Sequence, residues 1–384
     1  MNDDATKTLK NTSQKILTRH HAGPTAHLAV ETPQATGVSD SWSLVMPVRD
    51  GEMLLGFIAI HRGSKEHPAF GATRIEDYPD TESALSDALD LSTLMSHKAA
   101  MAGIPYGGAK GVLLNGPHLK NKKSRDHALS VYAQHVDKLG GKFVTGSDAG
   151  VSQEDVMVMR SHSPHIVGIE EDPTKRTAEG LLGSIFVTLA HVFGEPMLEG
   201  RTFAIQGVGK VGSAILDLIY LEARQVTIAD TDEARTKEAK AKYPNIQVVA
   251  PGEIVSADVD IFIPCALGGV LNEKTVETIR AKAIVGSANN QLSSKEAGDR
   301  LHERGIMYAP DYVVNAGGLI SVVHEYEKAH DKASEGDLTH DIAAIQTRLD
   351  NIFKESKKNG IPMHRIADTL AHMRIDALYP NMPK

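Results

Sequence analysis

Two lysines, Lys98 and Lys110, lie twelve residues apart in an apolar segment, and Lys110 closely follows the pair Gly107 and Gly108. Lysine side chains usually stay in solvent, but a lysine beside a glycine turn in such a segment fits a pocket lined by backbone. Burial and a neighbouring cation lower the pKa of a lysine, which suits it to polarising a carbonyl or moving protons. The alternative is a helix that ends in a glycine-rich turn, with both lysines in solvent.

The composition is that of an ordinary globular protein with room for two domains: 384 residues, 41% apolar and 23% charged. Its 41 basic and 49 acidic side chains give a net charge of −8, so we expect no nucleic-acid partner. Cys265 is the single cysteine, which excludes a disulfide within the chain and a cysteine-rich metal site. We therefore predict no metal and a cytoplasmic location.

The first residues are polar and contain no apolar core of a signal peptide, and no apolar stretch of about 18 residues follows. We therefore expect no membrane association. Residues 1–41 show no clear periodicity and are interpreted as an N-terminal extension. Beyond them, the patterns predict strands over 43–47, 54–61 and 142–145, and helices over 81–102, 126–139 and 151–159, the last capped by Ser152.

Near Thr177 the pattern changes to a regular alternation of helices and strands. It predicts a helix over 178–193, strands over 202–206, 225–229, 260–264, 283–286 and 307–309, and terminal helices over 319–330, 341–359 and 363–377. Such alternation is typical of a doubly wound parallel sheet. We predict an α/β fold with two domains. These are a substrate domain (42–177 plus about 350–384, the C-terminal helices returning to it) and a Rossmann domain (178–349).

Gly207, Gly209 and Gly212 form a G-x-G-x-x-G pattern between a predicted strand and a predicted helix, with Lys210 and Val211 in the same turn. The glycines permit a tight turn and close approach of a pyrophosphate to the helix N-terminus. The pattern therefore predicts a dinucleotide site, the alternative being a glycine-rich turn in an unrelated α/β fold.

Asp230 ends the next predicted strand, eighteen residues after Gly212. A carboxylate there accepts hydrogen bonds from ribose hydroxyls and repels a 2′-phosphate, so it predicts NAD rather than NADP. Lys210 and Arg235 leave the choice open.

Two further loops, 264–269 and 286–291, follow predicted strands and carry Cys265, Ala266 and Asn289. Ligands of doubly wound sheets bind at the carboxyl ends of the strands, so both loops are expected to line the cofactor site. Cys265 is interpreted as a buried, inert thiol rather than a nucleophile, because no activating base is evident nearby in the sequence.

Together these features resemble the amino acid dehydrogenase family that includes leucine, phenylalanine, valine, tryptophan and glutamate dehydrogenases. The likeness runs from about residue 57 to the last helices and is greatest to the leucine and tryptophan branch. The motifs that carry it, in the family's order, are 68–74, 95–112, 145–148, 177–180, 207–212, 287–292 and 310–318.

The resemblance implies NAD-linked, reversible oxidative deamination of an L-amino acid to a 2-oxo acid and ammonia. By position, Lys98 matches the lysine that binds the substrate carboxylate, Lys110 the catalytic lysine, and Asp148 the catalytic aspartate that accepts a proton from the substrate ammonium. From the residues alone, a capping or loop carboxylate is the favoured interpretation of Asp148.

The resemblance also places Thr177 near the nicotinamide, and Asn289 and Asn315 near the nicotinamide and the substrate. Alternatively, Thr177 is the N-cap of the next helix and the asparagines fix loops. Substrate side-chain choice falls by family position to four residues that are also readable as plain core. They are Phe70, Gly71, Leu319 and Val322.

All four are apolar or small, so we expect an apolar, leucine-like amino acid, with a tryptophan- or phenylalanine-directed enzyme as the alternative. A third hypothesis is a catalytically weak NAD-binding protein that acts through a partner. Two departures from the family pattern are His97, where a tyrosine is frequent, and Gly111, where a larger residue is frequent. Family members are homo-oligomers built through the first domain, so at least a dimer is expected.

Overall fold

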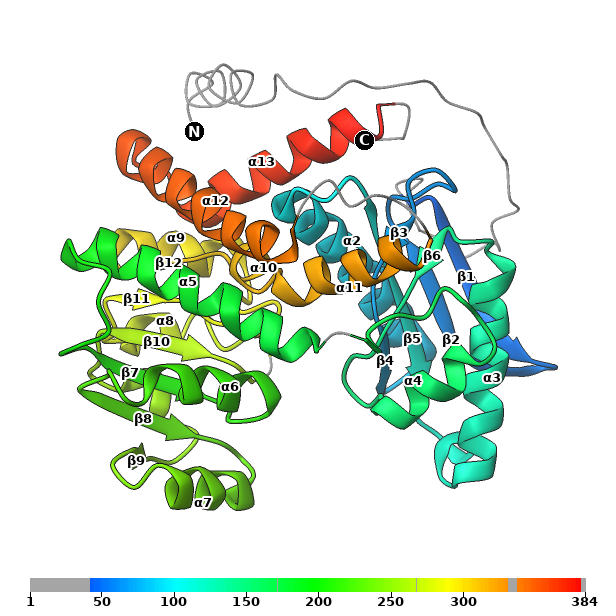
Figure 1. Ribbon diagram of the computed structural model, residues 1–384, viewed down its shortest axis with the longest axis horizontal. Coiled ribbons are helices and arrows are strands. Elements are labelled where there is room, and N and C mark those ends of the chain that lie inside the picture. The colour runs from blue at the N-terminus through cyan, green and yellow to red at the C-terminus, as the bar shows by residue number, and fades with distance from the viewer. Residues whose placement is uncertain (1–41, 171, 267, 331–336, 381–384) are drawn as a thin grey trace.

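The computed structural model describes residues 42–170, 172–266, 268–330 and 337–380, and it contains two sheets in separate halves of the molecule (Figure 1). The predicted extension, 1–41, lies outside the described residues. The first sheet has the order β1-β2-β5-β3-β6, with β4 paired to β5. Its strands are β1 (Leu44–Asp50), β2 (Met53–Ile60), β3 (Ala69–Phe70), β4 (Thr73–Glu76), β5 (Gly107–Leu114) and β6 (Phe143–Val144).

Helices α2 (Thr81–Ala102), α3 (Lys122–Lys138) and α4 (Gln153–Arg160) and the short turn η1 (Pro117–Leu119) belong to the first half. The predicted bounds of α2 are confirmed. α3 begins at Lys122 rather than at residue 126, because the Asn121 side chain caps it by accepting from the Ser124 amide. Ser152 caps α4, as predicted, in a reciprocal pair with Asp155.

The second sheet is parallel throughout, with the order β12-β11-β10-β7-β8-β9. All five predicted strands are present, and β9 was missed because its two residues are exposed and show no apolar run. The strands are β7 (Thr202–Gln206), β8 (Gln225–Ala229), β9 (Gln247–Val248), β10 (Ile261–Pro264), β11 (Ala283–Ile284) and β12 (Met307–Tyr308). The Rossmann prediction is confirmed.

Helices of this half are α5 (Pro173–Phe193), α6 (Lys210–Ile219), α7 (Glu233–Lys242), η2 (Ile254–Ser256), α8 (Thr275–Thr278) and α9 (Lys295–Glu303). α5 begins five residues before its predicted start, since Asp172 caps it by accepting from the Thr174 amide. Thr177 therefore lies inside the helix, and its interpretation as an N-cap is wrong.

The chain ends with α10 (Asp311–Val314), α11 (Gly317–Ala329), α12 (Leu338–Asn359) and α13 (Met363–Leu378). α12 packs on α5, where Asp350 pairs with His191 at 2.8 Å. α13 packs on α2, and Arg374 donates to the carbonyl of Ala100 at 2.8 Å. The last helix thus reaches an element of the first half, whereas the predicted domain boundaries stay a prediction.

A buried carboxylate on α11 fixes the segment that joins the two halves. Glu325 accepts hydrogen bonds from the amides of Gly168 at 3.1 Å and Ile169 at 3.2 Å. These residues lie just before α5, so the carboxylate sets where the chain passes from one half to the other.

The glycine at position 111 is explained by its neighbour on α3. A Cβ on Gly111 would lie 1.9 Å from the hydroxyl oxygen of Tyr132. That hydroxyl is buried and shares a hydrogen bond of 2.7 Å with Thr73, which in turn contacts Thr145 at 2.9 Å. The tyrosine hydroxyl occupies the volume that a larger residue at position 111 would need.

We predict that Gly111→Ala destabilises the protein by about 1–3 kcal/mol through overpacking. Tyr132→Phe removes the clashing oxygen, so the double variant should lose less stability than the sum of the two single variants. The measurement is the unfolding midpoint of the four proteins in urea. Additive losses of stability would show that the Tyr132 hydroxyl is not the reason for a glycine at position 111.

Candidate active site

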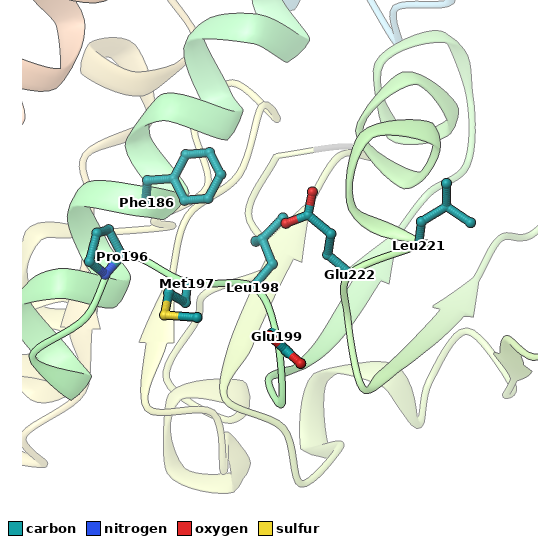
Figure 2. Close-up of a pocket in the computed structure, with 7 residues that line it drawn as sticks. All are labelled: Phe186, Pro196, Met197, Leu198, Glu199, Leu221 and Glu222. Carbon is teal, nitrogen blue, oxygen red and sulfur yellow. The ribbon is translucent and has the colours of Figure 1, made fainter.

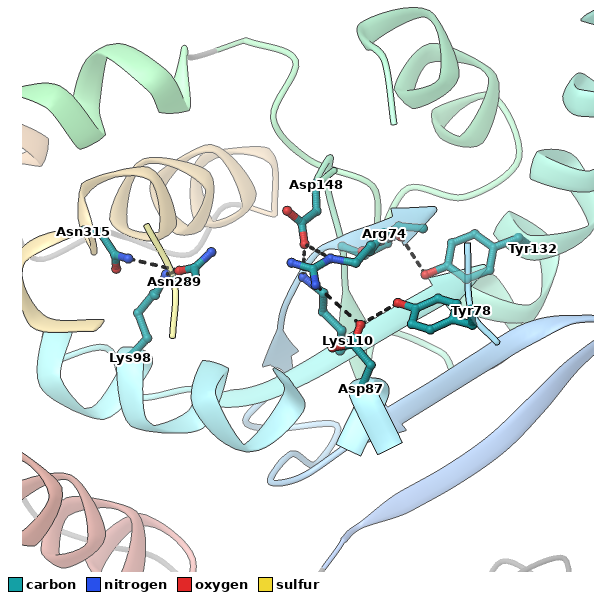
Figure 3. A network of polar contacts seen from close by, with 11 residues as sticks. Arg74, Tyr78, Asp87, Lys98, Lys110, Tyr132, Asp148, Asn289 and Asn315 are labelled. Carbon is teal, nitrogen blue, oxygen red and sulfur yellow. Dashed lines mark hydrogen bonds and ion pairs between the residues drawn. The ribbon is translucent and has the colours of Figure 1, made fainter. Parts of the chain in front are cut away.

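A buried charge pair joins the two predicted catalytic residues. Lys110 lies on β5 and donates from Nζ to Oδ2 of Asp148, which lies in the loop after β6 (Figure 3). Their side chains are 5% and 20% exposed. Burial alone would raise the pKa of Asp148, but the charges of Lys110 and Arg74 outweigh it and hold the pKa well below its usual range.

Arg74, to which the sequence analysis gave no role, is the second cation on this carboxylate. From β4, its Nε lies 3.2 Å from Oδ2 of Asp148, and its Nη1 lies 3.4 Å from Oδ2 of Asp87 on α2. Tyr78 donates to the same Asp87 oxygen at 2.5 Å. The sequence offered one signal for Arg74, because this residue ends motif 68–74.

Lys98 connects the two halves. From α2, its Nζ donates at 2.9 Å to Oδ1 of Asn289, in the loop after β11 (Figure 3). Burial lowers the pKa of Lys98 to about 8, and nearby Lys110 adds to this effect while Asp311 opposes it. Both lysines are therefore buried. The interpretation that placed them in a pocket predicts this, whereas the alternative placed both in solvent.

Asn315 completes this contact. Its Nδ2 donates to Oδ1 of Asn289 at 3.0 Å and to the carbonyl of Ser287 at 3.1 Å, so it also fixes the loop, as the alternative supposed. Its own Oδ1 is buried without a hydrogen-bond partner among the described residues. An unpaired buried acceptor is costly, so it points to a donor that arrives with a ligand.

Asp311 is a second residue to which the sequence analysis gave no role. Its carboxylate accepts from the amides of Gln291 at 2.9 Å and Tyr312 at 2.7 Å, which ties the loop of Asn289 to α10. Burial raises the pKa of Asp311, against the opposing effects of these amides and Lys98. Its place inside motif 310–318 was the available signal.

The glycine turn after β7 has the shape that a dinucleotide requires. Gly207 has a φ of +88°, and a Cβ on Gly212 would lie 1.9 Å from the Gly207 carbonyl oxygen. Gly209 caps α6 without a side-chain hydrogen bond, so the first amides of the helix stay open to a phosphate. Lys210 and Val211 are the first two residues of α6.

The neighbouring loop lies directly against this turn. A Cβ on Gly207 would lie 2.8 Å from the Cβ of Ala266, and one on Gly212 would lie 3.3 Å from the Cβ of Cys265. β7 and β10 are adjacent at the point where the strand order reverses, which is the usual ligand site of such sheets. Burial raises the pKa of the Cys265 thiol, which favours the inert, protonated form.

Asp230 anchors the turn. Its carboxylate accepts from the amides of Val208 and Asp232, each at 2.9 Å, and lies 3.8 Å from Nη1 of Arg235. At the other end of the site, Thr177 donates to the Pro173 carbonyl at 2.7 Å. The glycine turn and the Asp230 carboxylate beside it fit a nicotinamide dinucleotide.

Three of the four residues assigned to the substrate side chain lie in one apolar cluster. Phe70 and Leu319 are buried in it, and Val322 packs against it. The Phe70 ring lies 5.0 Å from that of Tyr106 and 5.3 Å from that of Tyr326.

Gly71 is placed differently. Its amide donates to the Val144 carbonyl at 3.0 Å, and a Cβ would lie 1.9 Å from the carbonyl oxygen of Ala109 on β5. Close packing against β5 therefore explains why this residue is a glycine.

His97 packs away from Asn289, although it precedes Lys98 in α2. Its ring lies 4.7 Å from that of His372 on α13 and 6.0 Å from that of Tyr312 on α10. Burial lowers the pKa of His97 to about 4, with His372 adding to the shift, so the ring is neutral near pH 7. It belongs to the packing between α2 and the terminal helices.

A separate surface groove lies near the amino ends of β7 and β8, opposite the edge that carries Gly207 (Figure 2). Its lining residues are Phe186, Pro196, Met197, Leu198, Glu199, Leu221 and Glu222.

In the ranges that the structure describes, no three His, Cys, Asp or Glu side chains are grouped to hold a metal ion. No helix of those ranges is long and apolar enough to cross a membrane.

Comparison with known proteins agrees with this geometry. Residues 41–165 match the family model of the Glu/Leu/Phe/Val dehydrogenase dimerisation domain, and residues 232–379 match that of Glutamate/Leucine/Phenylalanine/Valine dehydrogenase. The chain is 38% identical over 322 residues to L-tryptophan dehydrogenase of Nostoc punctiforme, covering 83% of this chain and 88% of the relative. It is 33% identical over 332 residues to leucine dehydrogenase of Bacillus subtilis, covering 85% and 88%.

Solved structures show the same fold. The crystal structure of L-tryptophan dehydrogenase from Nostoc punctiforme superposes with a TM-score of 0.73 at 36% identity, over 89% of this chain and 98% of that one. A hetero-hexameric glutamate dehydrogenase from Thermus thermophilus gives 0.71 at 20% identity, over 98% and 97%, and shows the fold alone.

The fold and the site thus define a two-domain oxidoreductase of the amino acid dehydrogenase class. The chain belongs to the Glu/Leu/Phe/Val dehydrogenase family, and its likeness is to the leucine and tryptophan branch.

Proposed function

We propose that the protein catalyses NAD-dependent, reversible oxidative deamination of an apolar, leucine-like L-amino acid to the 2-oxo acid and ammonia. The observation that carries the proposal is the Lys110–Asp148 pair together with Lys98, three charged side chains placed around the contact between the halves. The named relatives, which include a phenylalanine dehydrogenase of Bacillus thermotolerans at 35% identity, support the class of substrate.

Each charged side chain has a task in this reaction. The Lys98 ammonium binds the substrate carboxylate. The Lys110 ammonium stabilises the negative charge that develops on the carbinolamine oxygen and orients the attacking water. The Asp148 carboxylate accepts a proton from the substrate ammonium, which frees the amine for imine formation.

Nicotinamide dinucleotide, when bound, takes up the hydride from the substrate Cα. Gly207, Gly209 and Gly212, with Lys210 and Val211, would hold its pyrophosphate. Asp230 would hold the adenine ribose and favour NAD over NADP, while Cys265, Ala266, Thr177 and Asn289 would line the nicotinamide end. Asn315 offers its unpaired Oδ1 to a donor of the substrate or the carboxamide.

The apolar cluster around Phe70, Leu319 and Val322 supports an apolar substrate, because these side chains pack among other hydrophobic side chains of the described residues. A site of this kind discriminates one methylene by only about 1–3 kcal/mol. Phenylalanine or tryptophan therefore remains the second candidate, supported by the named relatives. We further propose a cytoplasmic homo-oligomer assembled through the first domain (42–177 plus about 350–384).

The first test is NADH formation by the purified protein with L-leucine, valine, phenylalanine, tryptophan or glutamate, and with NADP in place of NAD. We expect turnover on an apolar amino acid with NAD. Lys110→Ala should abolish it while NAD affinity stays nearly unchanged. NAD binding without turnover on any of these substrates would favour a protein that acts through a partner.

A second test uses the pKa of Lys98. Because the pKa is about 8, the ammonium is present below that pH and lost above it. We predict that KM for the 2-oxo acid rises as the pH passes 8, and that Lys98→Met removes this dependence and raises KM about a hundredfold. The control is KM for NAD, which should not follow Lys98. A pH-independent KM for the 2-oxo acid in the wild type would contradict the assignment.

A further inference from the structure

The Asp148 carboxylate contacts two cations, although a single cation would suffice to keep it ionised for proton transfer. Lys110 and Arg74 both contact Oδ2, which leaves Oδ1 outside both ion pairs. Arg74 is only 21% exposed, and it is held from the far side by Asp87, which Tyr78 binds in turn. The order Tyr78, Asp87, Arg74, Asp148, Lys110 is therefore a continuous chain of contacts that runs from the segment after β4 to Lys110 on β5 (Figure 3).

We infer that Arg74 is a positioning residue for the deamination proposed above. It anchors Oδ2 of Asp148, turns Oδ1 toward the substrate and shares the carboxylate charge so that Lys110 does not hold it alone. Asp87, steadied by Tyr78, fixes the guanidinium in the plane where Nε faces Asp148 and Nη1 faces Asp87. The inference rests on the proposed function for the proton transfer assigned to Asp148.

Arg74 and Asp87 carry opposite charges, so removing one or the other should change the reactivity of Lys110 in opposite directions. Removing Arg74 leaves Asp148 paired with Lys110 alone, so the carboxylate holds the Lys110 side chain more tightly and slows its reaction with an external reagent. Removing the charge of Asp87 leaves Arg74 with one anion fewer, so Arg74 attracts Asp148 more strongly and Lys110 reacts faster. A residue that serves only folding would produce no such opposite changes.

The experiment measures the rate of Lys110 labelling by an amine-selective reagent at one fixed pH, read by mass spectrometry of the Lys110 peptide, in the full-length protein. We expect labelling of Arg74→Gln to be about tenfold slower and labelling of Asp87→Asn to be faster by a smaller factor. Arg74→Lys, which keeps the charge, should restore most of the labelling rate. Lys122→Gln removes a surface cation that pairs with Asp126 at 3.3 Å in the same half and should leave the rate unchanged.

Turnover is measured in parallel on the best amino acid substrate. Arg74→Gln should lower kcat at least tenfold with KM for NAD unchanged, and Arg74→Lys should recover part of it. Unchanged labelling in both Arg74→Gln and Asp87→Asn would overturn the inference. If the wild type turns over none of the amino acids, the proposed function fails, while the labelling still decides whether Arg74 governs the Lys110–Asp148 pair.

If Arg74→Gln does not fold, Tyr78→Phe replaces it. This variant keeps every charge and loosens only Asp87, so it should leave the rate of Lys110 labelling nearly unchanged and lower kcat, because the Arg74 guanidinium is less well fixed. Wild-type kcat in both Tyr78→Phe and Asp87→Asn would overturn the inference.

Discussion

The structure depends on keeping a charge pair, Lys110 and Asp148, in a place with little water. Taking two ions out of solvent costs desolvation free energy. This cost is offset only if the remaining hydrogen-bonding atoms of both ions find partners. Arg74 supplies one such partner on the Asp148 side. On the opposite side, Lys98 is buried and donates to Asn289 at 2.9 Å. Each charge is thus held by a neighbour, which sets the proton affinities that acid–base chemistry uses.

The rest of the fold serves to bring these groups to one point from distant parts of the chain. α2 carries Lys98 and Asp87, β5 carries Lys110, and the loop after β6 carries Asp148. The parallel sheet of the second half brings the loops after β7, β10 and β11 to the same edge. Glu325 on α11 holds the crossing segment between the halves through backbone amides. The candidate site is therefore held by buried polar contacts as much as by apolar packing.

Much of this was predictable from the sequence because it rests on local signals. The glycine turn, the cap of α4 and the alternation of helices and strands are each readable within a short window of residues. Lys98, Lys110 and Asp148 emerged from motifs of the family, and the family is confirmed. The structure brings Lys110 and Asp148 into contact, although their roles stay predictions.

What could not be predicted rests on contacts between segments far apart in the chain. Arg74 stands at the end of motif 68–74, yet only the pairing of β4 with the loop after β6, where Thr73 bridges to Ser147, brings its guanidinium to Asp148. Gly111 was noted only as a departure from the family pattern. The hydroxyl of Tyr132, from a helix later in the chain, fills the space that a larger residue would need and so explains the glycine. The start of α5 was misplaced because Thr177 resembled a cap as strongly as Asp172 did.

The most direct measurement of the central claim is a single-turnover experiment on Asp148→Asn, which keeps the shape of the side chain and removes its charge. The enzyme is loaded with NAD and mixed rapidly with the apolar L-amino acid that the wild type uses fastest, and NADH formation is followed. We predict normal NAD binding and a rate lower by about 10²–10⁴-fold, the usual contribution of a positioned acid–base group. NADH formation at the wild-type rate would contradict the assignment of proton transfer to the Lys110–Asp148 pair.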